Sequence, residues 1–367
     1  MALSPIILIL FSLSFLSLIF NFQSFFLSIF LFIFSLYYLS FLFYLPFPLK
    51  SNPKSFSHPI KISTVVPAYN AEKTIEKCIN SVKGCDEIIV VFEGSDKTVE
   101  NIKRFKVKVL SRKTRLGKAK ALNLGIKKAK NEYVLIIDAD TFTSSIPKLK
   151  KLKLEEKAAI TGRIKVIPRS LFDHLQAIEF SLVNLIRFLQ NKRGYIDSMP
   201  GNFGLYRKSV LRKLGYFNAD TLTEDYELSL RMKKAGYKIG YLDEIEAVTE
   251  LPSSFSQFLK QRIRWYRGEI EVFKKFKCII PFSFYLLPPL LLLLNLIYTF
   301  PSIPFLDFSL VFILIILILG SLIYSKAPFK QILLVTSILP LVCYGLLIYI
   351  IWIIAFLKEL FKTKKSW

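Results

Sequence analysis

The chain has 367 residues, of which 51 are Lys or Arg and 27 are Asp or Glu, which gives a formal net charge of +24. It is also 53% hydrophobic, with a mean hydropathy of +0.43. A basic excess of this size points to a polyanionic partner. The hydropathy excludes an ordinary soluble nucleic-acid binder, a disordered chain and a small disulfide-stabilised domain.

The charge and the hydrophobicity come from different parts of the chain. Residues 1–49 contain no charged residue, and 279–357 contain three. Residues 50–278 hold 45 basic and 25 acidic residues, a net charge of +20. The sequence therefore predicts a charged soluble domain between two membrane-associated ends. The four cysteines lack metal-ligand spacing and are predicted to be reduced structural thiols: Cys78, Cys85, Cys278 and Cys343.

The N-terminal apolar segment is too long for one spanning helix, which needs about 20 residues. Asn21 and Gln23 interrupt it, so residues 1–48 are predicted to be a transmembrane hairpin with helices at 3–20 and 25–45. Basic residues follow immediately at Lys50, Lys54 and Lys61. Because positive flanks favour the cytoplasmic side, the middle domain is expected at the cytoplasmic face of the cell membrane.

The C-terminal segment 279–357 is predicted to form further transmembrane helices, followed by a basic tail at 358–367. It contains three apolar blocks: 279–300, 305–325 and 331–357. Three crossings would place the Lys-rich tail outside, against the positive-inside tendency. Pro288 and Pro289 break the first block, so it could be re-entrant instead. The number of spans and the side of the tail stay open.

The middle domain, 49–252, alternates predicted strands and helices. The strands are 60–66 (closed by Pro67), 87–92, 106–110 and 132–137, and the helices are 71–83, 94–105 and 117–130. This alternation is typical of βαβ units, so it predicts an α/β fold with a parallel sheet covered on both faces. Ligands of such sheets bind at the carboxyl ends of the strands.

Two polar features lie at those strand ends. Asp138-Ala139-Asp140 follows the fourth strand, and two carboxylates so spaced can hold a divalent cation that bridges a diphosphate. A polar turn is the alternative interpretation. Lys118 opens a predicted helix, where it can meet phosphate oxygens or simply remain a solvated helix end.

Two more features follow in the second half of the domain. Glu224 and Asp225 begin a helix, where carboxylates either cap the helix or, as proposed for Asp225, act as a general base towards a hydroxyl. Gln261, Arg264 and Trp265 share one face of a helix predicted within 253–278. These side chains suit an oligophosphate and a sugar ring, and the helix itself is basic and amphipathic, as expected at a membrane interface.

The set of motifs, in this order, resembles the family 2 glycosyltransferases. It consists of Pro67-Ala68-Tyr69-Asn70-Ala71-Glu72, Glu93-Gly94-Ser95-Asp96, Gly117-Lys118, Asp138-x-Asp140, Thr223-Glu224-Asp225 and Gln261-x-x-Arg264-Trp265. The last two motifs look like the membrane-embedded branch of the family. That branch includes cellulose, hyaluronan and poly-N-acetylglucosamine synthases and ceramide glucosyltransferase.

The resemblance implies a GT-A (Rossmann-like) nucleotide-sugar domain inserted between N-terminal and C-terminal transmembrane helices, with Mg²⁺ or Mn²⁺ as cofactor. It implies a nucleotide-diphosphate sugar donor, expected to be a UDP-sugar. The catalytic residues would be Asp225 and Glu224, and the metal ligands Asp140 and Asp138. The substrate-binding residues would be Ala68, Tyr69, Glu72, Glu93, Lys118, Asp138, Gly201, Asn202, Gln261, Arg264 and Trp265.

The chain departs from the family pattern at two places. Glu93 stands where the family usually has Asp, and Asp96 comes one residue early. The segment 199–204 matches the acceptor loop loosely.

The expected function is an integral-membrane inverting hexosyltransferase acting on a glycan or lipid-linked acceptor, with polysaccharide and glycolipid products both open. The alternative is a membrane-tethered basic module that binds anionic lipid or nucleic acid without catalysis. The expectation for the enzyme itself is no nucleic-acid partner.

Overall fold

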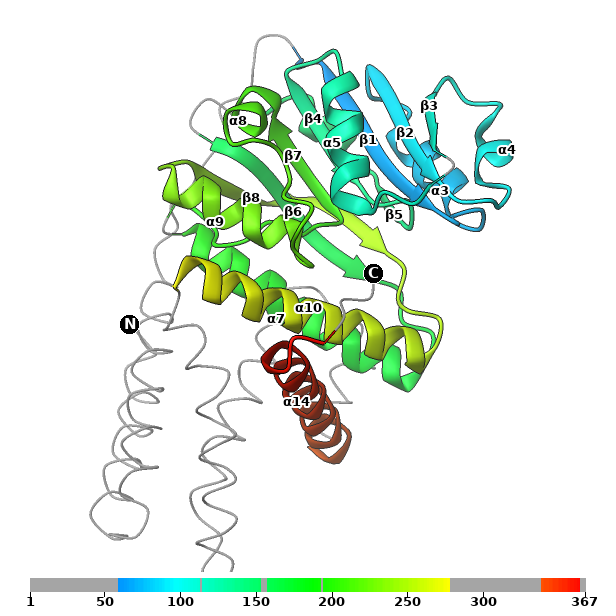
Figure 1. The fold of residues 1–367 in the computed structure, drawn as a ribbon. Coiled ribbons are helices and arrows are strands. Elements are labelled where there is room, and N and C mark those ends of the chain that lie inside the picture. The colour runs from blue at the N-terminus through cyan, green and yellow to red at the C-terminus, as the bar shows by residue number, and fades with distance from the viewer. Residues whose placement is uncertain (1–58, 113, 153–156, 193, 278–337, 364–367) are drawn as a thin grey trace, which may run out of the picture. The chain divides into compact units, whose positions relative to one another are not determined.

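An eight-stranded mixed sheet lies at the centre of the computed structural model, which describes residues 59–112, 114–152, 157–192, 194–277 and 338–363 (Figure 1). The strands are β1 (Ile62–Tyr69), β2 (Glu87–Glu93), β3 (Lys108–Arg112), β4 (Tyr133–Ile137), β5 (Thr141–Thr143), β6 (Lys157–Val166), β7 (Phe203–Arg207) and β8 (Lys238–Thr249). Their order across the sheet is β3-β2-β1-β4-β7-β6-β8-β5. All the described residues fall in one of the chain's two units, 50–278 with 321–367.

Helices connect and cover the strands. They are α3 (Ile75–Val82), α4 (Thr98–Ile102), α5 (Lys118–Lys128), α6 (Ile146–Leu149), α7 (Leu171–Asn191), α8 (Lys208–Lys213), α9 (Glu224–Lys234), α10 (Phe255–Phe276) and α14 (Ile338–Leu360). Every helix and strand predicted between residues 60 and 137 is present, with ends shifted by a few residues, and α4 is much shorter than the predicted 94–105.

The prediction of a parallel sheet is correct for only part of it. β1, β2, β3 and β4 pair in parallel, as the βαβ pattern indicated. β7 is antiparallel to both β4 and β6, and β5 is antiparallel to β8. The long helix α7 carries the chain from the end of β6 back to β7, which enters the sheet in the opposite direction. Strand patterns within residues 60–137 contain no information about that return.

Pro67 does not end the first strand, contrary to the prediction. β1 continues to Tyr69, and Pro67 stands opposite Val91 of β2. On the other side, pairing of β1 with β4 stops at Val65. At Pro67, β1 therefore pairs with β2 alone. A proline has no N–H to donate, and here no carbonyl group of β4 needs one.

Two hydrophobic clusters pack on opposite faces of the sheet. One combines Ile62 and Val66 of β1 with Ile75 and Ile79 of α3. The other combines Val65 of β1 with apolar residues of α5, α8 and α9. Alternate residues of β1 thus face different clusters, as expected for a strand covered on both faces.

Three long helices form a separate layer beside the sheet. α7 contacts β6 and β8, and α14 contacts both α10 and α7 (Figure 1). Phe172 of α7 meets Phe258 of α10 edge to face, with ring centroids 4.8 Å apart. Ser170 caps α7 in a capping box with Asp173, which fixes where this helix begins. The apolar side chains of α7 are divided between packing and solvent, since Leu175 and Ile178 are buried while Leu171 is 56% exposed.

The membrane predictions fall mainly outside the described residues. The helices expected at 3–20, 25–45, 279–300 and 305–325 lie there, and so does Cys278. α14 covers part of the 331–357 block and continues to Leu360. Within the described part of the chain, its segment Cys343–Leu360 is long and apolar enough, by length and composition, to cross a bilayer. The domain boundaries drawn from the sequence remain predictions.

Candidate active site

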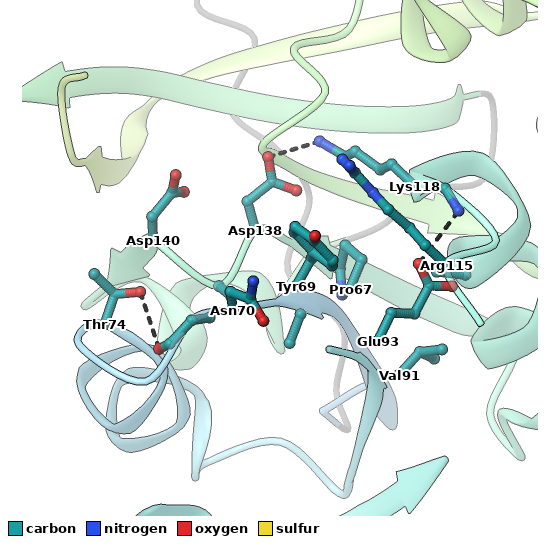
Figure 2. Close-up of a pocket in the computed structure, with 15 residues that line it drawn as sticks. Pro67, Tyr69, Asn70, Thr74, Val91, Glu93, Arg115, Lys118, Asp138 and Asp140 are labelled. Carbon is teal, nitrogen blue, oxygen red and sulfur yellow. Dashed lines mark hydrogen bonds and ion pairs between the residues drawn. The ribbon is translucent and has the colours of Figure 1, made fainter. Parts of the chain in front are cut away.

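A cavity of about 290 Å³ opens at the carboxyl ends of β1, β2 and β4. This is the edge at which an α/β sheet of this kind binds its ligands. Six residues predicted to bind substrate or metal line it together: Ala68, Tyr69, Glu93, Lys118, Asp138 and Asp140 (Figure 2). They come from four segments between residues 68 and 140, and the parallel strands bring them to one place.

An aromatic and a cationic side chain form one wall of the cavity. Tyr69, the last residue of β1, is 49% exposed, and the guanidinium carbon of Arg115 lies 4.1 Å from its ring centroid (Figure 2). A nucleobase can stack on such a pair. Arg115 was not singled out from the sequence. Its position could have indicated a role in binding, because Arg115 follows the carboxyl end of β3 and ligands are expected at that edge of the sheet.

Glu93 ends β2 and points a carboxylate into the cavity. The side chain is 3% exposed, and its Oε2 accepts a hydrogen bond of 3.2 Å from the backbone N–H of Gly117. Its Oε1 is buried and has no partner among the described residues. Since a buried carboxylate oxygen without a donor is costly, this atom is suited to accept an N–H or O–H group from a ligand.

Glu72 and Asp96 do not line the cavity but brace the turn beside it. The backbone N–H of Glu72 donates to Asp96 Oδ2 at 2.9 Å, and the N–H of Lys97 donates to Glu72 Oε2 at 3.3 Å. Asp96 Oδ1 also accepts from the hydroxyl of Thr98 at 2.6 Å. Burial alone raises the pKa of Asp96, but the Thr98 and backbone hydrogen bonds outweigh it and lower the pKa. The structure gives both carboxylates a local bracing role.

Lys118 connects the cavity to the second half of the domain. It is the first residue of α5, and its Nζ lies 2.6 Å from Asp138 Oδ2, 3.1 Å from the carbonyl oxygen of Gly201 and 3.8 Å from Glu224 Oε1. Burial by itself lowers the pKa of Lys118, but the carboxylates of Asp138, Glu224 and Asp225 outweigh it and raise the pKa. Lys118 is therefore a permanent cation at the centre of the site.

The two aspartates predicted as metal ligands suit a divalent cation. Asp138 Oδ1 is buried and has no partner among the described residues, while its Oδ2 accepts a hydrogen bond from Lys118 Nζ. Asp140 is exposed at the edge of the cavity, yet partial desolvation by the surrounding protein raises the pKa of its carboxyl to about 6, and the charge of Asp138 raises it further. No group of three or more His, Cys, Asp or Glu side chains that could by itself hold a metal ion occurs in the part of the chain described. A metal here would need further ligands from a bound diphosphate and water, as Mg²⁺ commonly does.

Glu224 and Asp225 form the first turn of α9. Glu224 is 3% exposed, and burial raises its pKa although Lys118 opposes the change. Asp225 Oδ1 accepts from the N–H of Tyr226 at 2.9 Å, which leaves Oδ2 facing Gly201. A Cβ on Gly201 would lie 2.6 Å from Asp225 Oδ2, so this loop passes directly beside the carboxylate. The neighbouring Asn202 contributes its carbonyl oxygen to the N–H of Asp138 at 3.0 Å.

The residues of the Gln-x-x-Arg-Trp motif lie on α10, which packs against the start of α9. Arg264 Nη1 donates to the carbonyl oxygen of Leu222 at 3.2 Å. Gly268, one turn further along, has Thr223 so close that a Cβ there would lie 2.5 Å from its methyl carbon. Gln261 and Trp265 are partly buried on the same helix. This motif therefore lies close to the start of α9, where Glu224 and Asp225 stand. Its residues are not among those that line the cavity described above.

Residues 63–215 match the family model described as glycosyl transferase family 2. This segment of the chain is therefore similar to the family 2 glycosyltransferases. The resemblance drawn from the motifs is confirmed by this match, and the matched range includes β1 to β7 with the whole cavity.

Several named glycosyltransferases are similar to this chain. The chain is 33% identical over 226 residues to a poly-beta-1,6-N-acetyl-D-glucosamine synthase of Staphylococcus epidermidis, covering 58% of this chain and 55% of that protein. The protein of the same name from Staphylococcus aureus strain COL is 32% identical over the same length, with the same coverage. The chain therefore spans about half the length of the curated relatives it matches.

The fold of this chain is shared with a solved structure over almost its full length. A mannosyltransferase from Pyrobaculum calidifontis, solved with GDP-Man and Mn²⁺, superposes with a TM-score of 0.61 and 19% identity. The match covers 99% of this chain and 100% of the other. It identifies the α/β sheet as the GT-A fold that the resemblance implied.

Proposed function

We propose that this chain is an integral-membrane inverting glycosyltransferase that uses a nucleotide-diphosphate sugar donor at the cytoplasmic face. The observation that carries the proposal is the position of Lys118. Its Nζ contacts Asp138 in the cavity at the carboxyl ends of β1, β2 and β4, where the donor would bind. The same Nζ lies 3.8 Å from Glu224, which is next to the candidate base Asp225. A single-displacement reaction needs a binding place for the diphosphate and a base for the acceptor hydroxyl, and Lys118 lies next to both candidate groups.

In the proposed reaction, Asp225 Oδ2 accepts the proton of the acceptor hydroxyl, since Oδ1 is already bonded to the N–H of Tyr226. The acceptor oxygen forms a bond to the anomeric carbon as the bond to the diphosphate oxygen breaks, and the configuration inverts. Lys118 and Arg264 offset the negative charge of the departing nucleotide diphosphate. Asp138 and Asp140 would hold Mg²⁺ or Mn²⁺, which when bound neutralises charge on the diphosphate.

The nucleobase would lie between Tyr69 and the unpaired Oε1 of Glu93. A carboxylate oxygen accepts hydrogen bonds, so the base must present an N–H there, as both uracil and guanine do. The relatives named as N-acetylglucosamine polymer synthases favour UDP-N-acetylglucosamine as the first donor to test, with GDP-mannose as the second. The acceptor is proposed to be a glycan or a lipid-linked hydroxyl.

The family match favours this enzyme over a binding module without catalysis. The membrane assignment is supported by the apolar ends of the sequence and by the length and composition of α14. The basic excess of residues 50–278 then has two uses, contact with an anionic leaflet and binding of a diphosphate.

The decisive experiment measures release of nucleotide diphosphate and formation of product by the full chain in lipid. A panel of UDP- and GDP-sugars is tested with Mn²⁺, with Mg²⁺ and with chelator. Asp225→Asn should lower transfer by about 10²-fold or more, because a positioned base contributes about 10²–10⁴-fold. The matched control is Glu100→Gln, an exposed carboxylate on α4, which should keep wild-type activity.

The proposal is rejected if no donor is turned over by the wild type, or if Asp225→Asn transfers at the wild-type rate. Analysis of the product by mass then separates a polymer from a lipid that carries one sugar.

A further inference from the structure

A buried arginine and two partly buried side chains form a polar cluster where α7, α10 and α14 meet. Arg262 of α10 is 1% exposed, and its Nη2 donates to Glu179 Oε2 of α7 at 2.8 Å. The hydroxyl of Tyr344 on α14 donates to the same oxygen at 2.6 Å. A buried guanidinium is costly unless it is paired, so this contact determines where the Arg262 side chain can lie.

The Arg262 side chain also packs on two aromatic rings of its own helix. Its guanidinium carbon lies 4.4 Å from the ring centroid of Trp265 and 5.1 Å from that of Phe258. Both distances are within the range of a cation–π contact, and a planar guanidinium stacks on an indole in a way that an ammonium does not. Arg262 is therefore the side chain that supports one side of the Trp265 ring.

The residues on either side of Trp265 along α10 contact the segment that leads to the candidate base. The preceding residue, Arg264, is bonded to Leu222, and Gly268 contacts Thr223, so α10 touches the chain immediately before Asp225. Trp265 lies on the same helix between these two residues, and its indole offers a face on which a sugar ring can stack. The Trp265 ring contributes most to acceptor affinity if it is already held in one orientation before the acceptor binds.

We propose that Arg262, held by Glu179 and Tyr344, is a positioning residue that fixes the Trp265 ring for an acceptor sugar. This inference rests on the proposed function and specifies that the acceptor group next to the reacting hydroxyl is a saccharide ring. It also makes acceptor binding depend on α14, because Tyr344 contributes its hydroxyl to the carboxylate that holds Arg262.

The test is steady-state kinetics of the full chain in lipid nanodiscs, with UDP-N-acetylglucosamine as donor and a short β-1,6-linked N-acetylglucosamine oligosaccharide as acceptor. Arg262→Lys keeps the charge beside Glu179 but removes the planar contact with Trp265. It should raise the KM for the acceptor by about 3- to 30-fold, the range expected for loss of a cation–π contact, and leave the KM for the donor unchanged.

Tyr344→Phe removes one hydroxyl without changing the packing volume, and it should raise the acceptor KM in the same direction. Combined with Arg262→Lys, it should add less than its separate effect, because both changes act through Glu179. The matched controls are Lys260→Met, an exposed cation on α10, and Tyr349→Phe, a second tyrosine of α14. Both should keep the wild-type KM values.

The inference is overturned if Arg262→Lys and Tyr344→Phe leave the acceptor KM unchanged, or if they raise the donor KM as much as the acceptor KM. Either result in an active wild-type background rejects this role of Arg262 alone. A wild type that turns over no nucleotide sugar rejects the proposed function itself, and this inference fails with it.

Discussion

Gly201 leaves no space for a side chain beside the candidate base. A Cβ at this position would lie 2.6 Å from Asp225 Oδ2 and 3.1 Å from the carboxyl carbon. The atoms that must yield are the end of the Asp225 side chain, and the backbone is not among the three nearest. A methyl group here thus acts on the chemistry more than on the fold.

We therefore expect Gly201→Ala to lower kcat by about 10- to 100-fold, the cost of displacing a catalytic group by about 1 Å. The thermal midpoint should change little. The measurement is kcat and thermal unfolding on the same preparation. A comparable change at Gly215, where no atom lies within 4 Å, is unsuitable as a control because its φ is +78°. An active Gly201→Ala enzyme would mean that Asp225 is not the base.

Glu269 of α10 carries a partly buried carboxylate near several charged groups. Burial raises its pKa to about 7, the carboxylates of Asp225 and Glu179 raise it further, and Arg262 opposes them. Its Oε2 is buried without a partner among the described residues, and Tyr266 is the other titratable group that interacts with it. Between the ordinary value of 4.5 and about 7, the folded protein binds more protons at this site than the unfolded chain does.

The free energy of unfolding should accordingly fall as the pH rises from about 4.5 to about 7, by on the order of 3 kcal/mol from this group. Glu269→Gln cannot ionise, so its thermal midpoint should fall less over this range and should exceed that of the wild type at about pH 8. Thermal unfolding in detergent at several pH values measures this. The exposed Glu100→Gln serves as control, and identical pH profiles for Glu269→Gln and wild type would contradict the prediction.

At the scale of elements, several contacts hold α10 against α9 and the residues just before it. Arg264 bonds to Leu222, Gly268 meets Thr223, and Lys275 Nζ lies 2.6 Å from Glu227 Oε1. In this ion pair Glu227 is fully buried while the Lys275 side chain is 47% exposed. The glycine is the point of closest approach, which explains why a residue that weakens a helix stands inside α10.

Gly268→Ala should separate α10 from the start of α9. A Cβ would lie 2.5 Å from the Thr223 methyl carbon and 2.6 Å from its hydroxyl oxygen. The overpacking cost of about 1–3 kcal/mol exceeds the gain of about 1 kcal/mol that Ala brings to a helix interior, so the thermal midpoint should fall. Transfer activity should fall as well.

The matched control is Gly345→Ala on α14, where nothing lies within 4 Å of the added Cβ. There the helix gain is unopposed, and the thermal midpoint should stay the same or rise. Equal effects of the two substitutions would show that α10 and α9 are not in close contact at Gly268.

At the scale of the whole molecule, two physical forces could hold the protein at a membrane. The excess of basic residues in 50–278 attracts anionic lipid, and salt screens that attraction. α14 exposes a set of apolar side chains that salt does not release from lipid: Leu346, Ile350, Ile354, Leu357 and Leu360.

We expect the protein to remain with the membrane fraction in about 1 M NaCl, where the Debye length is about 3 Å, and to be released by detergent. Sedimentation of membranes followed by immunoblotting measures this, with a peripheral protein as control. Release by salt alone would mean that the basic surface, and not the apolar segments, attaches the protein to the membrane.

Much of the fold could be predicted because its information is local. The strands and helices from 60 to 137 follow from hydrophobic periodicity, and the ligand-binding edge follows from the rule for parallel strands. The antiparallel β7 could not be predicted this way. Its position between β4 and β6 depends on the path of α7. The residues Phe203–Arg207 do not by themselves indicate which strands they pair with.

The sequence by itself determined the family, the division into a charged domain and apolar ends, and the types of side chain at the candidate site. Only the tertiary structure decided which of these residues act together. It places Lys118 between Asp138 and Glu224, moves Glu72 out of the cavity wall, and brings Arg262 against Glu179 of a distant helix. Residue types and short-range periodicity are read along the chain. Contacts between residues 20 or more positions apart depend on how the sheet and the long helices pack. Local sequence patterns do not specify that packing.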